Sequence, residues 1–337
     1  MRPTNLSSSR GRAQSIRRGS PFNGQTDRLE AEANSDHHVT ATVLESPFLQ
    51  ATERWLQDFE RHARVIAPDL GDVLNDYIGE AHFGAEIIDA EMSQLPRGAR
   101  VLEVGAGMLL LSCALRSAGY HVSAVEPVGI GFSHIDRLRE LVWNYAADRG
   151  CCPEVRPIKA EQLVADAEFD FAFSMNVMEH VDDVPVVLRR VLSALRPGAT
   201  YRFVCPNYRF PYEPHFGMPT LFSKALTGRV LRTRILESRT VIDPDGTWQS
   251  LNWISVASVR RTCRHLGVEP EFDRAISSRY VRRVIGDPSF QRRHSGAIAV
   301  LGASLDAIGV TRLLTLLPAG TQPAMSCRIT RPRVSHT

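Results

Sequence analysis

The residues best suited to bind a cofactor lie in the run Val101–Gly107, which reads VLEVGAG. Apolar residues lead into the carboxylate of Glu103 and a Gly-x-Gly turn, and an apolar stretch of helical length follows, which is typical of a strand feeding a cofactor-binding helix. The glycines let the backbone turn sharply and approach a ligand closely, while the next helix points its free N–H groups at the same place. The pattern predicts a nucleotide-type cofactor at this turn.

A second carboxylate supports this interpretation. Glu126 ends the apolar segment 122–125 and lies 19 positions after Gly107. An acid at the tip of the second strand, at about this spacing, accepts hydrogen bonds from ribose hydroxyls. The two carboxylates are therefore expected beside one cofactor, with Glu126 at its ribose.

Two kinds of cofactor compete for this turn. A dinucleotide fold needs a third glycine where this chain has Leu110, and a pyrophosphate would be repelled by Glu103. S-adenosylmethionine carries no phosphate and has an α-ammonium group that a carboxylate can hold, so it fits Glu-x-Gly-x-Gly better. The remaining alternative is a strand and helix of another α/β protein in which the glycines occur by chance.

The segments that follow continue an alternation of strands and helices. Strands are predicted at 155–158, 169–174 and 201–204, and a helix at 184–195. The polar segments after these strands are Ala160-Glu161, Asn176-Val177-Met178-Glu179-His180-Val181 and Cys205-Pro206-Asn207, and Arg196-Pro197-Gly198-Ala199 precedes the last strand.

This order of motifs resembles the class I S-adenosylmethionine-dependent methyltransferases, in particular the small-molecule group with an FD…S…LEHV fourth strand and a PGG…PN fifth strand. The resemblance covers roughly residues 97–207. It implies a Rossmann-like, doubly wound α/β sheet of seven strands, mostly parallel with an antiparallel last strand. In that family the residues ahead of the core and the insertions behind it shape the substrate side.

The resemblance also assigns residues to the parts of the cofactor and implies no metal ion. Two departures stand out, since Leu109 occupies a position where many members have a third glycine, and Lys159 replaces an Asp common before the Ala. The assignments place Glu103, Gly105 and Gly107 at the methionine end, Glu126 at the ribose, Ala160 and Glu161 at the adenine, and Asn176 at the mouth of the active site. From the helical segment ahead of the first strand, Tyr77 and His82 are candidates to close over the methionine end, or else pack the cap.

Composition and the family resemblance together divide the chain into five parts. The first holds many Arg and Ser residues with no acid before Asp27, which is typical of a disordered tail, although it also resembles a transit peptide. The expected parts are a tail at 1–40, an N-terminal helical cap at 41–96, the cofactor-binding core at 97–207, a substrate-side insertion at 208–250 and the C-terminal part of the methyltransferase domain at 251–331.

Charge, cysteine content and hydropathy exclude several classes of protein. The net charge of +3 is too small to indicate nucleic-acid binding. Six cysteines show neither metal-ligand spacing nor a disulfide framework, so a reducing cytosol is expected and the protein is predicted to be cytoplasmic. No apolar stretch approaches the roughly 20 residues of a membrane span. Basic residues in a helix predicted at 221–236, with the apolar run 307–317, still allow peripheral contact with an acidic lipid surface.

Methyl transfer from a sulfonium needs orientation and a dry site, and it needs a base only if the acceptor arrives protonated. The candidates are His215, Glu213 and His180, together with the hydroxyls of Tyr208 and Tyr212. His215 lies in the Pro- and aromatic-rich segment 207–219, which is predicted to be a stiff, irregular loop forming an acceptor wall. The alternatives are that His215 only hydrogen-bonds its loop and that His180 only fixes the turn after the fourth strand.

We therefore expect a methyltransferase acting on a small-molecule acceptor, by family resemblance more often at oxygen than at nitrogen or carbon. A non-catalytic binding or regulatory protein with the same fold is the alternative, and the intact cofactor motifs argue against it. A nicotinamide oxidoreductase conflicts with Glu103 and Leu110. The chain lacks the Asn/Asp-Pro-Pro-Tyr type of motif that is used for base methylation of nucleic acids. The sequence identifies neither the acceptor nor the oligomeric state.

Overall fold

A computed structural model of the chain describes residues 46–127, 133–221, 223–238, 241, 243–287, 290 and 313–333. Glu45–Thr337 forms one compact unit. The predicted tail at 1–40 and residues 307–312 of the apolar run lie outside the described residues. Among the described residues, no helix is both long and apolar enough to cross a membrane.

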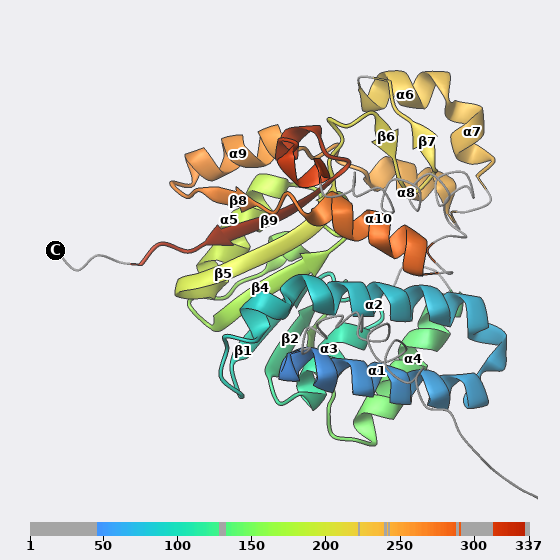
Figure 1. Cartoon of the computed structure of the whole chain (residues 1–337), viewed down its shortest axis with the longest axis vertical. Helices are drawn as coiled ribbons and strands as arrows, with labels where there is room; N and C mark the ends of the chain where they lie inside the picture. The colour runs from blue at the N-terminus through green and yellow to red at the C-terminus, as the bar shows by residue number, and fades with distance from the viewer. Residues whose placement is uncertain are drawn as a thin grey trace, which may run out of the picture. The chain divides into compact units, whose positions relative to one another are not determined.

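The unit is built on a seven-stranded sheet with the strand order β3-β2-β1-β4-β5-β9-β8 (Figure 1). β9 runs antiparallel to both of its neighbours, and the other neighbouring pairs are parallel. This confirms the doubly wound sheet that the motif order implied. The strands are β1 Arg100–Val104, β2 His121–Val125, β3 Glu154–Arg156, β4 Phe169–Met175, β5 Leu195–Pro206, β8 Pro270–Phe272 and β9 Ala324–Thr330.

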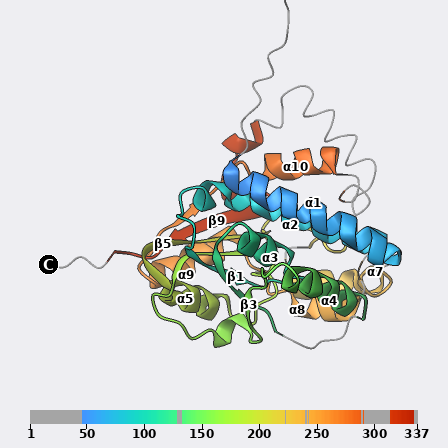
Figure 2. The same ribbon diagram turned by 90° about the horizontal axis from the view of Figure 1, so that it is seen from below.

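Helices cover both faces of this sheet (Figures 1 and 2). The helices are α1 Pro47–Ile66, α2 Gly71–Met92, α3 Leu110–Ser117, α4 Ser133–Ala147, α5 Val184–Ala194, α6 Lys224–Val230, α7 Arg232–Leu236, α8 Pro244–Ser250, α9 Val256–His265 and α10 Ile276–Gly286, with 3-10 turns η1 Pro68–Leu70, η2 Ala160–Gln162, η3 Leu314–Leu316 and η4 Ala319–Thr321. Helices α1 to α4 and α10 contribute side chains to the buried clusters on one face of the sheet. Helices α5 and α9 contribute to the buried cluster on the other face.

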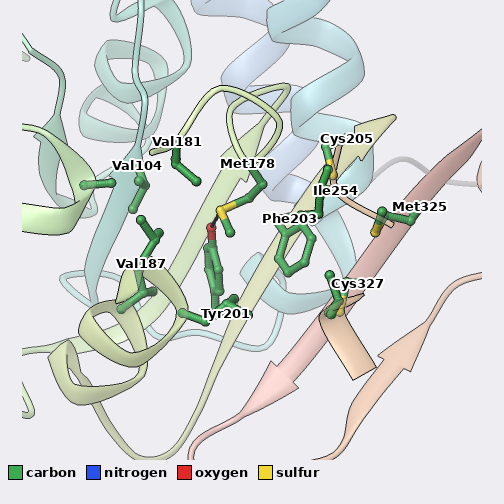
Figure 3. Close-up of a cluster of buried hydrophobic side chains, with 14 of the residues drawn as sticks. Val104, Met178, Val181, Val187, Tyr201, Phe203, Cys205, Ile254, Met325 and Cys327 are labelled. Atoms are coloured by element: carbon green, nitrogen blue, oxygen red, sulfur yellow. Dashed lines mark hydrogen bonds between the residues drawn. The ribbon is translucent and has the colours of Figure 1, made fainter. Parts of the chain in front are cut away.

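The core on the α5 face fixes the turn that follows β4. Alternate residues of β5, including Tyr201 and Phe203, point to this face because successive side chains of a strand point to opposite sides (Figure 3). The Tyr201 hydroxyl lies 2.7 Å from that of Ser174, on β4, and donates to the Met178 sulfur. Met178 and Val181 are buried in the same cluster. They anchor both sides of the Glu179-His180 dipeptide.

Two predicted elements differ from the structure in detail. The single helix predicted at 221–236 is wrong, because the chain leaves helical geometry at Leu231 and forms α6 and α7. The loop predicted at 207–219 is not wholly irregular, since β6 Tyr212–Glu213 pairs with β7 Met218–Pro219. Gly217, with a φ of +55°, supplies the left-handed residue that this tight connection needs.

Candidate functional site

A cavity of about 470 Å³ opens at the carboxyl ends of β1, β2 and β4. The strand order reverses beside β1, and doubly wound folds bind their ligands in the crevice at such a point. Residues more than 70 positions apart in the sequence meet on its wall. All seven residues assigned to the cofactor line it, namely Glu103, Gly105, Gly107, Glu126, Ala160, Glu161 and Asn176.

The turn after β1 depends on glycine at two positions. Gly105 has a φ of +74°, and a Cβ built there would lie 2.3 Å from Cγ2 of Val177, so only glycine fits. Gly107 has a φ of +49° with open space around it, which leaves room for a ligand against the backbone. Leu109 keeps the left-handed conformation, with a φ of +65°, that glycine would adopt without strain. The departure at Leu109 therefore preserves the backbone path.

Two carboxylates face the cavity from β1 and β2. Glu126 accepts the Gly107 N–H at 2.8 Å, and burial raises the pKa of Glu126 above its usual value. Glu103 is buried and accepts a hydrogen bond from the Ser112 hydroxyl. Burial raises the pKa of Glu103 to about 8, against the opposing effect of that hydrogen bond. A ligand ammonium beside Glu103 would stabilise the ionised form of this carboxylate by giving it a positively charged partner.

The end of the cavity assigned to the adenine is bordered by η2. Glu161 lines the cavity, but its carboxylate also accepts the backbone N–H groups of Asp182 and Asp183, at 2.7 and 3.2 Å. Lys159 pairs with Asp182 at 2.7 Å. These contacts tie η2 to the turn that leads into α5.

The opposite end of the cavity is closed by α2. Tyr77 and Glu80 line the wall there, whereas His82 is not among the lining residues. Asn176 has a φ of +54°, which asparagine tolerates, and its amide donates to Glu80 at 3.2 Å. Glu80 also pairs with Arg283, on α10, at 3.1 Å. Sequence reasoning did not identify Glu80, because one carboxylate on an amphipathic helix gives no signal of its own.

The three candidate catalytic residues lie together beside this end. His180 lines the cavity, and the His215 ring centre is 5.1 Å from that of His180. Glu213 is fully buried and accepts hydrogen bonds from His215 Nδ1 at 2.6 Å, the Tyr208 hydroxyl at 3.2 Å and the Phe216 N–H at 2.7 Å. Neither His215 nor Glu213 is among the residues that line the cavity. Of the three candidates, His180 is the one that lines the cavity.

Glu179 joins this group and was missed by the sequence analysis. Its side chain is fully buried, and neither carboxylate oxygen meets a hydrogen-bond donor among the described residues. Burial raises the pKa of Glu179 to about 7. Burial, followed by the charge of His215, lowers the pKa of His180 to about 4, so this imidazole is neutral near pH 7.

The turn that carries Glu179 and His180 is held from the C-terminal half of the chain. The Asn252 N–H donates to the Glu179 carbonyl at 2.8 Å, and its amide donates to the carbonyls of Met178 and Val181. His180 Nδ1 lies 2.8 Å from the Ser250 hydroxyl. The region after β5 therefore positions the site even though it lies far away in sequence.

Two aromatic residues of segment 207–219 pack against tryptophans from a later part of the chain. Tyr208 stacks on Trp253 with ring centres 4.5 Å apart, and Phe216 meets Trp248 edge to face. Both are buried in the core, and none of the aromatic residues of this segment is among the cavity-lining residues. The aromatic acceptor wall predicted for this segment is therefore not part of this cavity.

A second cavity, of about 740 Å³, lies at the other edge of the sheet, where β1, β2 and β4 begin. Its charged side chains are engaged with one another or with neighbouring groups, as in the Arg196–Asp170 pair. Ligands of doubly wound folds bind at the carboxyl ends of strands, so we assign no function to this cavity.

Comparison with known proteins identifies the family. The family described as "Methyltransferase domain" matches residues 81–269, more than half of the chain. An uncharacterized protein of Mycobacterium tuberculosis is 40% identical over 278 residues, which cover 82% of this chain and 94% of that protein. A ubiquinone biosynthesis O-methyltransferase of Xanthomonas axonopodis is 28% identical over 178 residues, covering 52% and 65%.

Among solved structures, a putative sarcosine dimethylglycine methyltransferase from Galdieria sulphuraria aligns with a TM-score of 0.43 and 16% identity, over 76% of this chain and 88% of that one. The family match carries the assignment. This chain belongs to the methyltransferase-domain family, and its sheet has the doubly wound topology implied for the class I S-adenosylmethionine-dependent methyltransferases.

The residues that line the cavity are chemically suited to S-adenosylmethionine. Glu126 offers a carboxylate for a ribose diol, and the open backbone at Gly107 lets the ligand approach. Lys159 is the one Lys or Arg among the described residues that line the cavity, and it is already paired with Asp182, which suits a ligand without phosphates.

Proposed function

We propose that the protein transfers the methyl group of S-adenosylmethionine to an oxygen atom of a small-molecule acceptor. The observation that carries this proposal is the convergence of the seven assigned residues on one cavity, with His180 on its wall and Glu179 and His215 grouped beside His180. A methyl acceptor bound at the mouth of the cavity beside His180 would meet groups able to handle a proton. The family match supports the methyltransferase class but leaves the acceptor open.

Glu126 is proposed to hold the ribose hydroxyls. Its carboxylate is fixed by the Gly107 N–H and faces the cavity. Glu126→Ala should weaken S-adenosylmethionine binding by about 1–3 kcal/mol, because hydrogen bonds to a charged acceptor are lost. Calorimetry would measure the change. Glu154→Ala, in the adjoining strand β3 but outside the cavity, is the control, and an unchanged affinity for Glu126→Ala would move the ribose contact elsewhere.

Glu103 is proposed to hold the α-ammonium of the cofactor. Because the pKa of Glu103 is raised to about 8, the free protein keeps it largely protonated at pH 7, and binding an ammonium should release that proton. In the free protein the raised pKa contributes stability at low pH that is lost as pH rises through about 8.

The released proton can be measured by calorimetry at pH 7 in buffers with different ionisation enthalpies. Wild-type protein should show a heat that varies with the buffer, and Glu103→Gln should bind more weakly with less buffer dependence. Identical buffer dependence in the two proteins would contradict this role of Glu103.

The protein's contribution to methyl transfer lies in positioning and in handling the proton. The bound cofactor supplies the electrophilic methyl group. In the simplest mechanism of methyl transfer, His215 accepts the proton of the acceptor hydroxyl, and the buried carboxylate of Glu213 holds His215 through Nδ1. His180, which is neutral near pH 7, borders the cavity. Removal of the hydroxyl proton frees an oxygen electron pair to form the new bond to carbon. The Tyr208 hydroxyl donates to Glu213, so it is not proposed as a base.

The acceptor can be found directly. The purified chain would be incubated with methyl-labelled S-adenosylmethionine and a metabolite extract, and labelled products identified by mass spectrometry. The proposal expects a small product labelled at oxygen, absent with Gly105→Ala. Label on nitrogen or carbon would refute O-methylation, and cofactor binding without any product would favour the alternative, a non-catalytic binding or regulatory protein.

A peripheral membrane contact is proposed at α6 and α7. Leu226, Val230 and Leu236 are exposed there, and exposed arginines lie between them. Such a surface suits an anionic lipid headgroup layer. The chain should co-sediment with vesicles rich in phosphatidylglycerol and not with phosphatidylcholine alone, and Arg229→Glu with Arg232→Glu should abolish the difference. Sedimentation at background with both vesicles would remove this proposal.

Other partners and the compartment follow from composition. We propose that the protein does not act on nucleic acid, since its net charge is only +3. The six cysteines are free thiols, which supports the proposal of a reducing, cytoplasmic compartment.

A further inference from the structure

Glu179, His180 and His215 bring together the ligand types of a transition-metal site. A carboxylate oxygen of Glu179 and one ring nitrogen from each histidine lie within 4.8 Å of one another. Metal bonds of about 2.0–2.2 Å to nitrogen and oxygen can join atoms up to about 4.2 Å apart, so small side-chain rotations would close the set around one ion.

The hydrogen bonds of the two imidazoles assign their tautomers. The Ser250 hydroxyl donates to the Thr247 carbonyl at 2.8 Å, so it accepts from His180 Nδ1. The carboxylate of Glu213 likewise accepts from His215 Nδ1. With Nδ1 protonated, each ring carries its lone pair on Nε2. Metal-binding histidines are oriented in this way, by a second group that accepts the other N–H.

The environment of Glu179 is an independent indication that this cluster binds a ligand. It is fully buried, and both of its oxygens lack a donor among the described residues. Leaving a buried carboxylate without a partner costs free energy unless a cation or proton neutralises it. Two other carboxylates, Glu213 and Glu80, add negative potential at this point. A cation therefore suits the cluster better than an anionic or neutral ligand.

We propose that Glu179, His180 and His215 bind one divalent transition-metal ion, with Zn²⁺ as the probe. Two imidazoles and one carboxylate form a set that binds such ions and leaves coordination positions open. His180 lines the cofactor cavity, so an open position would face the mouth where the acceptor is proposed to bind.

The inference deepens the proposed function and rests on it for the catalytic part. An acceptor hydroxyl bound at the open position would lose its proton to solvent water, because the ion lowers the pKa of a coordinated oxygen. The oxygen electron pair would form the bond to the methyl carbon, and the carbon–sulfur pair would leave with sulfur. In this form His215 is a ligand and not the base, and Glu213 orients it.

The sequence contains no clear signal for this site. His180 and His215 are 35 positions apart, and Glu179 lies within a motif otherwise explained by the fold. The expectation of a site without metal came from the family's motif order and from the absence of a ligand cluster in the sequence, and neither detects ligands that converge only in the fold.

The test is calorimetric titration of chelator-dialysed full chain with Zn²⁺ in the absence of cofactor. Wild-type protein should bind one ion per chain with a saturable heat. Glu179→Gln, which keeps side-chain size, should weaken that binding by at least about 10-fold, and Ser250→Ala, which removes the acceptor for His180, by about 10–100-fold. His265→Gln, at the exposed end of α9, should leave it unchanged.

The possible outcomes distinguish the metal site from the proposed methyl transfer. Equal Zn²⁺ binding by wild type and Glu179→Gln, or none by wild type, would overturn the metal site. Methyl transfer to the extract acceptor that persists after chelation would also overturn its catalytic role and leave the proposed methyltransferase with His215 as base. A specific Zn²⁺ site in a protein that transfers no methyl group would sustain the metal site and remove the proposed function.

Discussion

Replacing His215 with glutamine is expected to lower turnover by about 10²–10⁴-fold, because the variant lacks an imidazole lone pair near the place where the acceptor is proposed to bind. Glutamine retains a polar side chain that can still bond to Glu213. His215 is not among the cavity-lining residues, so affinity for S-adenosylmethionine should change little. The prediction holds whether the imidazole takes the proton itself or holds an ion.

The measurement is single-turnover methyl transfer to the acceptor found in the extract, with cofactor affinity determined in parallel. His265→Gln makes the same chemical change at an exposed position and should behave as wild type. Normal turnover of His215→Gln across pH 6 to 9 would show that His215 only fixes its loop, and Glu213 or His180 would then be the remaining candidates.

Gly105→Ala is expected to destabilise the fold and to abolish cofactor binding at ordinary ligand concentrations. The left-handed backbone at φ +74° costs a non-glycine residue about 1–2 kcal/mol. The new Cβ would also lie 2.3 Å from Cγ2 of Val177, and relieving that overlap costs about 1–3 kcal/mol more. Val177 is short and β-branched, so it can move only with the backbone between Asn176 and Met178.

Gly98→Ala is the matched control for this variant. Gly98 has a φ of +81°, and nothing lies within 4 Å of the position that a Cβ would occupy. Gly98 is not among the residues that line the cofactor cavity. Urea unfolding should show a loss of about 1–2 kcal/mol for Gly98→Ala with normal cofactor affinity, and a larger loss for Gly105→Ala. Equal losses with normal affinity in both variants would contradict the role assigned to the turn.

The sequence predicts the sheet and the cofactor cavity because both depend on local patterns. Glu103 and Glu126 each end an apolar strand, and parallel strands bring their carboxyl ends to one edge of a sheet. Once the strands were recognised, the convergence of these carboxylates followed from topology. The left-handed conformation of Leu109 was not predicted, although Leu109 occupies a position where many members of the family have glycine.

Contacts between distant segments could not be predicted in this way. Ser250 and Asn252 hold the turn at Glu179 and His180 from a part of the chain with no recognisable motif. The break at Leu231 within a continuous helical pattern is likewise set by tertiary packing, since the buried residues Thr227 and Ile235 lie on either side of it. The buried state of Glu179 has no counterpart in composition or spacing.

The proposed methyl transfer depends most directly on the cavity between Glu103 and Glu126 being the S-adenosylmethionine site. Calorimetry of the full chain with S-adenosylmethionine, S-adenosylhomocysteine and NAD in separate titrations tests this assignment. We expect saturable binding of the first two, weakened in Glu126→Ala and lost in Gly105→Ala, and no binding of NAD. No heat with either adenosyl compound alongside clear binding of NAD would contradict it.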